Sequence, residues 1–196
     1  MKRKRIAVIC IALLAVMTIA GCKKKKGEET LTGKHHASIE VVDYGTIKVE
    51  LDADAAPLTV TNFVKLANNK FYDGLTFHRI IDGFVIQGGD PLGNGTGGSD
   101  EKIKGEFTAN GVKNPISHVR GAISMARSSA YDSASSQFFI VQSDALQLDG
   151  EYAAFGQVTE GMDIVDQICK DAVVTDANGT VAPENQPVIK EVKIED

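Results

Sequence analysis

Two neighbouring runs of strand-forming residues, 75–81 and 84–87, are separated only by Asp82 and Gly83. β-branched, aromatic and aliphatic residues dominate both runs, and an Asp-Gly pair between such runs is a strong signal of a two-residue turn. The sequence therefore predicts a β-hairpin. Arg79 interrupts the apolar pattern of the first arm. A charged group among strand residues needs partners or a function, so this hairpin is the first candidate for a functional site.

The other periodic segments indicate a mainly β fold. Helical spacing occurs in only two places, after Pro57, which suits a first helical turn, and from Gly161 to Lys170. Further strand-like runs cover residues 38–42, 46–51, 119–126, 136–142, 153–158 and 188–194. Because no strand–helix–strand repeat is present, we expect about eight strands in a mainly antiparallel sheet that closes on itself.

Phe138 and Phe139 follow one another within a strand-like run. Successive strand residues point to opposite faces of a sheet. One ring is therefore expected in the core and the other in a second apolar surface.

The N-terminus has the pattern of a bacterial lipoprotein signal. Basic residues at positions 2–5 precede an apolar run, 6–20, of about 15 residues, whereas a membrane-spanning helix needs roughly 20. The run ends in Ile-Ala-Gly-Cys at positions 19–22, which resembles a lipobox, whose cysteine is lipidated and becomes the mature N-terminus. This predicts a signal peptide over 1–21 and a lipidated Cys22. The alternative is ordinary cleavage that leaves a free thiol at Cys22.

Residues 22–37 are polar and lack periodicity, so they are expected to form a flexible tether before a folded domain over 38–196. The lysines at 23–26 would lie at the lipid surface, where they either attract anionic headgroups or act only as a solvated spacer. Without residues 1–36, 12 of the 21 basic and 24 of the 26 acidic residues remain. This net charge of −12 disfavours nucleic-acid partners.

Nucleophilic and metal chemistry are poorly supported. Cys169 is the only cysteine of the expected domain, which excludes an intramolecular disulfide and suggests a packed thiol. The four histidines fit no zinc spacing or catalytic motif: His35, His36, His78 and His118. Residues 93–98 formally match a dinucleotide fingerprint, but no apolar helix follows them, so a surface loop is expected. We expect neither a metal nor a cofactor.

Several short blocks, taken together and in order, resemble the cyclophilin-type peptidyl-prolyl cis-trans isomerases. The blocks are 77–81, Phe84, 87–90, 95–98, 124–126, 136–140 and 148–150, and the resemblance covers residues 39–196. It implies a closed eight-stranded antiparallel barrel capped by two helices, with the site on the outer barrel surface. It also implies an enzyme that accelerates rotation about X-Pro bonds without a cofactor.

The resemblance assigns roles to ten residues. Arg79 is the expected catalytic residue, because a guanidinium can donate a hydrogen bond to the prolyl nitrogen when that atom becomes pyramidal in the twisted amide. Gln87 binds substrate backbone or orients Arg79. The remaining substrate-binding residues are Phe84, Val85, Phe139 and Leu148 around the proline ring, Ala126 and Arg127 along the peptide groove, and Gln137 and Tyr152.

The chain departs from the family pattern at four positions of the site. Many members have methionine at Val85, asparagine at Arg127, tryptophan at Gln147 and histidine at Tyr152. Tyr152 still offers an aromatic face. Family members use the indole at position 147 to contact cyclosporin, so the glutamine here leaves open whether this chain is sensitive to that inhibitor. Arg79 and the proline pocket are retained.

The predicted protein is a monomeric isomerase, held by its lipid on the extracytoplasmic face of a bacterial cell membrane, that acts on exported, partly unfolded chains. A second hypothesis is a module or chaperone that binds proline-containing segments, with incidental catalysis. A third is a structural lipoprotein with a degenerate fold. Isomerisation of a short X-Pro peptide separates the first two.

Overall fold

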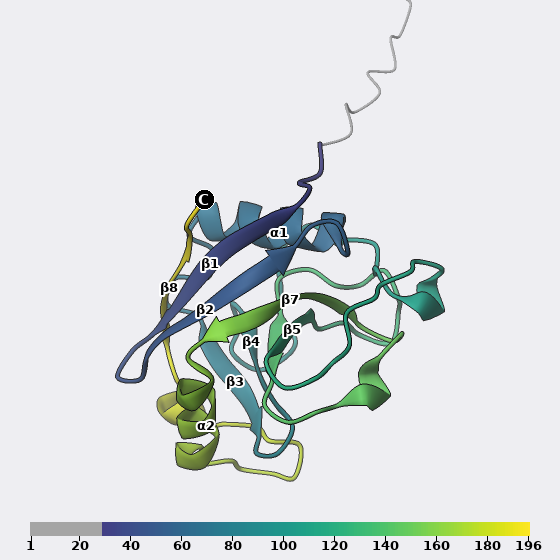
Figure 1. The fold of residues 1–196 in the computed structure, drawn as a ribbon. Coiled ribbons are helices and arrows are strands. Elements are labelled where there is room, and N and C mark those ends of the chain that lie inside the picture. Colours follow the sequence, from purple (N-terminus) through teal and green to yellow (C-terminus); the bar gives the residue numbers. More distant parts are fainter. Residues whose placement is uncertain (1–28) are drawn as a thin grey trace, which may run out of the picture.

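The computed structural model describes residues 29–196 (Figure 1). The predicted signal peptide over 1–21, the predicted lipidation site Cys22 and the lysine run at 23–26 lie outside these residues. In the described part, no helix has both the length and the apolar character needed to cross a membrane.

Eight strands form one antiparallel sheet in the order β3-β4-β6-β5-β7-β2-β1-β8. Their bounds are β1 Lys34–Val41, β2 Gly45–Asp52, β3 Thr76–Ile81, β4 Val85–Asp90, β5 Ala122–Met125, β6 Phe138–Val141, β7 Ala153–Glu160 and β8 Ile189–Ile194. The two edge strands meet where Thr76 bridges Val188 and the amide of Phe77 donates to the carbonyl of Pro187 over 3.0 Å. The predicted eight-stranded, mainly antiparallel fold is confirmed.

Within residues 29–196, two α-helices lie at opposite ends of the curled sheet (Figure 1), as predicted. Helix α1 spans Pro57–Asn68, with proline in the first turn, where its missing N–H costs no helical hydrogen bond. Helix α2 spans Met162–Asp171 and packs beside β2. The described part of the chain also contains three short 3₁₀ turns: η1 Thr108–Asn110, η2 Leu146–Leu148 and η3 Pro183–Asn185.

The apolar residues divide into two clusters, and the division passes between Phe138 and Phe139. Phe138 is fully buried in the main core inside the barrel, where its ring packs edge-on against Phe63 and Tyr72. Phe139 belongs to a smaller cluster on the outer face of the sheet, with Val85, Ala122, Val141 and Ala145. The expected alternation of the two rings is confirmed, and it locates a second apolar surface outside the barrel.

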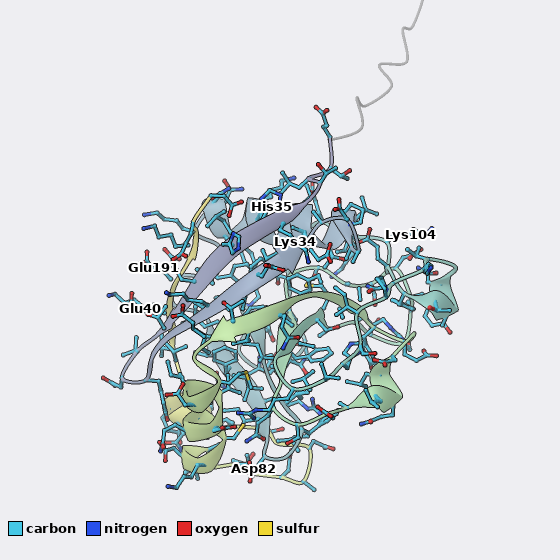
Figure 2. The ribbon with its side chains drawn as sticks, in the orientation of Figure 1. Lys34, His35, Glu40, Asp82, Lys104 and Glu191 are labelled. Atoms are coloured by element: carbon cyan, nitrogen blue, oxygen red, sulfur yellow. The ribbon has the colours of Figure 1, made fainter. Side chains whose placement is uncertain are left out.

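The folded domain begins earlier than the predicted boundary at Ser38. Strand β1 starts at Lys34, so assigning residues 34–37 to the flexible tether is wrong. Lys34 forms ion pairs with Glu50 and Asp52 on β2, and His35 contacts the Asp196 carboxylate at the C-terminus. Figure 2 shows Lys34 and His35 along β1. Polar residues extend this strand because their partners on β2 and at the C-terminus are also polar.

Candidate active site

A hollow of about 140 Å³ lies on the outer face of the barrel. Nine of the ten predicted site residues line it: Arg79, Phe84, Val85, Gln87, Ala126, Arg127, Phe139, Leu148 and Tyr152. Four of them, Phe84, Ala126, Leu148 and Tyr152, pack against the smaller apolar cluster. The structure thus brings together residues from four separate stretches of the chain. Their roles in binding and catalysis stay predictions.

Strand pairing accounts for this convergence. Arg79 on β3 lies opposite Gln87 on β4, Gln87 lies opposite Phe139 on β6, and Phe139 lies opposite Ser124 on β5. Residues paired in this way share one face of a sheet. The row Arg79–Gln87–Phe139–Ser124 therefore crosses four strands on the face away from the main core. It brings residues 45 positions apart in the sequence, Arg79 and Ser124, into one line.

The Arg79 guanidinium is held from two sides. Its Nε donates to the backbone carbonyl of Asn178 over 2.9 Å, and its Nη1 donates to Oε1 of Gln87 over 3.2 Å. Partial burial lowers the pKa of the guanidinium, while Tyr152 and Asp176 act in the opposite direction. The group nevertheless stays charged, because arginine is not deprotonated in proteins. Among the contacts within residues 29–196, Nη2 forms no hydrogen bond, so this nitrogen remains available to donate to a ligand.

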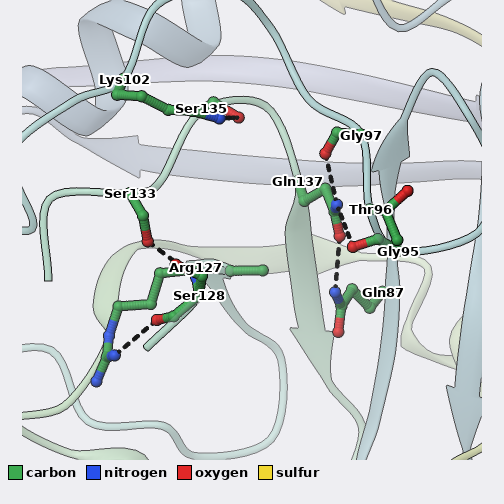
Figure 3. Close-up of a pocket in the computed structure, with 11 residues that line it drawn as sticks. Gln87, Gly95, Thr96, Gly97, Lys102, Arg127, Ser128, Ser133, Ser135 and Gln137 are labelled. Atoms are coloured by element: carbon green, nitrogen blue, oxygen red, sulfur yellow. Dashed lines mark hydrogen bonds between the residues drawn. The ribbon is translucent and has the colours of Figure 1, made fainter. Parts of the chain in front are cut away.

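Gln137, the tenth predicted residue, does not line the first hollow but forms a hydrogen bond with Gln87. Its Oε1 accepts from Nε2 of Gln87 over 2.9 Å, and its own Nε2 donates to the carbonyls of Gly95 and Gly97 over 3.1 and 2.8 Å (Figure 3). Gln137 lines a second hollow of about 260 Å³ that adjoins the first, since Gln87, Ala126 and Arg127 border both. A chain of side-chain amides therefore connects Arg79 to the glycine-rich loop.

The glycine-rich loop is built around the Asp90 carboxylate. Burial alone would raise the pKa of Asp90, but hydrogen bonds from backbone amides of the loop bring it below its usual value. A Cβ atom at Gly97 would lie 2.1 Å from Oδ1 of Asp90, so only glycine fits this position. No helix follows the loop, which confirms the surface loop expected instead of a dinucleotide-binding turn.

Aromatic rings form one wall of the first hollow. Phe139 packs edge-on against Tyr152, with ring centroids 5.8 Å apart at 84°. The Arg127 guanidinium lies 4.8 Å from the centre of the Tyr152 ring and 5.0 Å from the centres of both Phe107 and Tyr131. Figure 3 shows that this guanidinium is directed away from Gln137. Arg127 thus packs over the Tyr152 ring while it also lines the hollow.

Sequence reasoning missed several residues around the site. Asn178 and Thr180 contact Arg79 from a segment about 100 positions later, and the second hollow includes Lys102, Ser128, Ser133 and Ser135. His118 forms hydrogen bonds with Asp149 and Ser124 directly behind Phe139. The contacts of Arg79 with Asn178 and of His118 with Asp149 have no local signal, because each joins segments that only the folded barrel brings together.

No group of three or more His, Cys, Asp or Glu residues suited to a metal ion occurs among residues 29–196. Cys169 is buried, and burial raises the pKa of its thiol to about 12, which confirms the expected packed thiol. The arrangement offers a fixed hydrogen-bond donor beside an apolar hollow, and it can stabilise a developing lone pair or negative charge on a bound amide.

Comparison with known proteins gives consistent matches. The family described as Cyclophilin type peptidyl-prolyl cis-trans isomerase/CLD matches residues 36–195. A peptidyl-prolyl cis-trans isomerase of Helicobacter pylori (strain ATCC 700392 / 26695) is 46% identical over 143 residues, 72% of this chain and 84% of the relative. Peptidyl-prolyl cis-trans isomerase B of Bacillus subtilis (strain 168) is 44% identical over 153 residues, 78% of this chain and 93% of the relative.

A solved structure shares the fold. It is the crystal structure of a Cryptosporidium parvum cyclophilin type peptidyl-prolyl cis-trans isomerase in the presence of the dipeptide Ala-Pro. The TM-score is 0.72 at 31% sequence identity, and the alignment covers 82% of this chain and 99% of the other.

Proposed function

This chain belongs to the cyclophilin-type peptidyl-prolyl cis-trans isomerase family and is such an isomerase, and we propose that Arg79 catalyses the rotation of X-Pro bonds bound in the outer hollow. The observation that carries this assignment is the doubly held guanidinium with an unengaged Nη2 beside an apolar wall. The related structure solved with Ala-Pro supports a proline-containing peptide as the ligand.

The barrier to be lowered comes from amide resonance. Rotation about a peptide bond costs roughly 18–20 kcal/mol because the C–N bond is partly double, and uncatalysed X-Pro isomerisation takes tens to hundreds of seconds. As the bond twists, resonance is lost and the prolyl nitrogen gains a localised lone pair. A hydrogen bond from Arg79 to that nitrogen is stronger in the twisted state than in the planar one. Only such a difference accelerates the reaction.

The other residues in and beside the hollow have separate roles in this proposal. Phe84, Val85, Phe139 and Leu148 provide apolar walls for the proline ring. Gln87 orients the guanidinium through the bond to Nη1, and Gln137 fixes the amide of Gln87. With the ring held by its walls, the acyl part of the substrate is free to rotate. The reaction requires no nucleophile and no proton transfer.

The direct test is isomerisation of a short X-Pro peptide by the purified full-length chain, compared with Arg79→Ala. Wild type is expected to exceed the uncatalysed rate strongly. A wild type that binds the peptide without exceeding that rate would support the binding-module hypothesis instead. An Arg79→Ala variant as active as wild type would remove Arg79 from the mechanism.

We further propose that Cys22 carries the lipid that holds the domain at the membrane, where its clients are exported, partly unfolded chains. The lipobox-like sequence at 19–22 supports this. Two or three acyl chains, at about 0.8 kcal/mol per buried methylene, anchor a protein where a single chain is marginal. Cys22→Ala should release the protein from membranes or stop its processing, and a Cys10→Ala variant serves as the matched control. Unchanged membrane retention of Cys22→Ala would contradict the anchor.

A further inference from the structure

His118 lies behind the apolar wall and joins two parts of it. The imidazole is only 1% exposed. Its Nδ1 lies 2.8 Å from Oδ1 of Asp149, and its Nε2 lies 3.0 Å from Oγ of Ser124. Asp149 also accepts the backbone amide of His118 over 2.7 Å and the hydroxyl of Ser117 over 2.9 Å.

The hydrogen-bond partners fix the proton positions on His118. An ionised carboxylate can only accept, so Nδ1 carries the proton that is donated to Asp149. Burial lowers the pKa of His118 and favours the neutral ring, so Nε2 accepts a hydrogen bond from the hydroxyl of Ser124. Ser124 is fully buried, so its hydroxyl cannot reach a substrate and the Asp149–His118–Ser124 chain is not a nucleophilic triad. The chain must therefore serve the structure around it.

Two of the four residues that provide the apolar walls of the hollow, Phe139 and Leu148, are connected to this chain. The imidazole stacks on the Phe139 ring, with centroids 5.9 Å apart at an angle of 19°. Asp149 directly follows the η2 turn that carries Leu148 into the hollow. The backbone carbonyl of His118 also accepts the amide of Ala145 over 2.8 Å, at the start of η2. His118 thus contacts the back of one wall and holds both ends of the turn that presents the other.

We propose that His118 is a positioning residue that fixes Phe139 and Leu148 relative to each other and so sets the affinity of the hollow for a proline ring. This inference rests on the proposed function, because it concerns the same pocket. His118 would then influence substrate affinity without contacting the substrate. It belongs neither to the row Arg79–Gln87–Phe139–Ser124 nor to the substrate groove.

The position of His118 predicts a specific kinetic signature. The walls contact the proline ring equally in the planar and the twisted amide, so loosening them weakens both states together. Such uniform weakening raises KM and leaves kcat nearly unchanged. General destabilisation acts differently, because it lowers the amount of folded enzyme and reduces apparent kcat at constant KM. The two cases are therefore distinguishable.

The experiment measures kcat and KM for an X-Pro peptide with full-length wild type, His118→Ala, Asp149→Ala and the double variant. Each single change is expected to raise KM about fivefold to tenfold, the loss expected for one or two hydrogen bonds, with kcat changed less than about twofold. The double variant should raise KM no more than the larger single effect, because both residues belong to one unit. Additive effects on KM would contradict a shared chain.

Two further variants keep the test decisive if His118→Ala folds poorly. His118→Asn places an amide nitrogen near the position of Nδ1, so it retains the donor to Asp149 and should raise KM less than His118→Ala. Val60→Ala, in the main core on α1, is the control for stability, since Val60 is fully buried and belongs to the other cluster. It should lower the melting temperature and leave KM unchanged.

The outcomes separate the two proposals. If wild type does not accelerate isomerisation, the proposed function fails. If wild type is active but the His118 and Asp149 variants show the wild-type KM, with any loss confined to the amount of folded enzyme, only the positioning role of His118 is overturned.

Discussion

Arg79 and Gln87 lie directly opposite each other on β3 and β4, and Nη1 of Arg79 donates to Oε1 of Gln87 over 3.2 Å. The amide of Gln87 has one possible orientation here, because its Nε2 donates to Gln137 over 2.9 Å and so leaves Oε1 facing Arg79. The guanidinium is thus aimed by a neighbour whose own orientation is set by a third residue.

Gln87→Ala is expected to lower kcat/KM about tenfold, since a poorly oriented guanidinium loses most of the benefit of a positioned donor. Initial rates on an X-Pro peptide measure the effect. Gln167→Ala on α2, where the side chain bonds only to the exposed Asp171, is the control and should retain full activity. A Gln87→Ala enzyme with the wild-type rate would show that Arg79 needs no support from β4.

Arg79→Ala should lower kcat about 10²- to 10³-fold, the usual cost of removing one donor to a developing charge, with a much smaller change in KM. Arg79→Lys keeps the charge but loses the planar group that contacts Asn178 and Gln87 together, so it should recover little of this loss. Steady-state kinetics of the two variants provide the comparison. Full recovery by lysine would indicate that charge alone is sufficient.

Arg127→Ala is expected to destabilise the fold by about 1–2 kcal/mol, because the guanidinium lies over the rings of Phe107, Tyr131 and Tyr152. Urea unfolding measures the change. Glu151→Ala is the matched control, since it removes only the ion pair of Arg127, at 3.2 Å and on a half-exposed carboxylate, which should contribute less than about 1 kcal/mol. Equal losses in the two variants would attribute the stability to the ion pair.

The free energy of unfolding is expected to decrease from about pH 7 to about pH 5. Burial lowers the pKa of His78 and of His118 below the usual histidine value of about 6.5. At His78, the charge of Asp90 partly offsets this decrease in pKa, whereas the charge of Arg79 lowers the pKa further. At His118, Asp149 partly offsets the decrease in pKa. The unfolded chain then binds more protons than the folded chain below pH about 6.5, so stability rises with pH in that range and is lost as pH falls.

Urea midpoints across this pH range measure that dependence. His78 makes the cleaner probe, because within residues 29–196 neither of its ring nitrogens has a hydrogen-bond partner. His78→Asn should flatten the curve, whereas the exposed His36→Asn should leave its slope closer to that of wild type. A wild-type curve without slope between these pH values would contradict the buried neutral histidines.

The sequence predicts the hairpin, the two helices and the number of strands because each depends on local periodicity, as at Asp82-Gly83 and Pro57. The set of residues around Arg79 followed from a resemblance, and strand pairing explains why they meet. Local patterns could not reveal the start of β1 at Lys34, since its polar residues pair with polar partners on β2 and at Asp196. They could not reveal His118 either, whose partner Asp149 is 31 positions away.

The anchoring of Arg79 by the C-terminal segment also sets when the enzyme becomes competent. Asn178, which accepts from Nε of Arg79, lies 99 residues further along the chain, and the β3 edge is completed by Gly179, Thr180 and Val181. A chain is made from its N-terminus, so these contacts are among the last to become possible. A nascent or truncated chain that ends before Asn178 contains every residue of the hollow, yet it lacks half of the support of its guanidinium. Isomerase activity should therefore appear only after the last part of the chain has emerged.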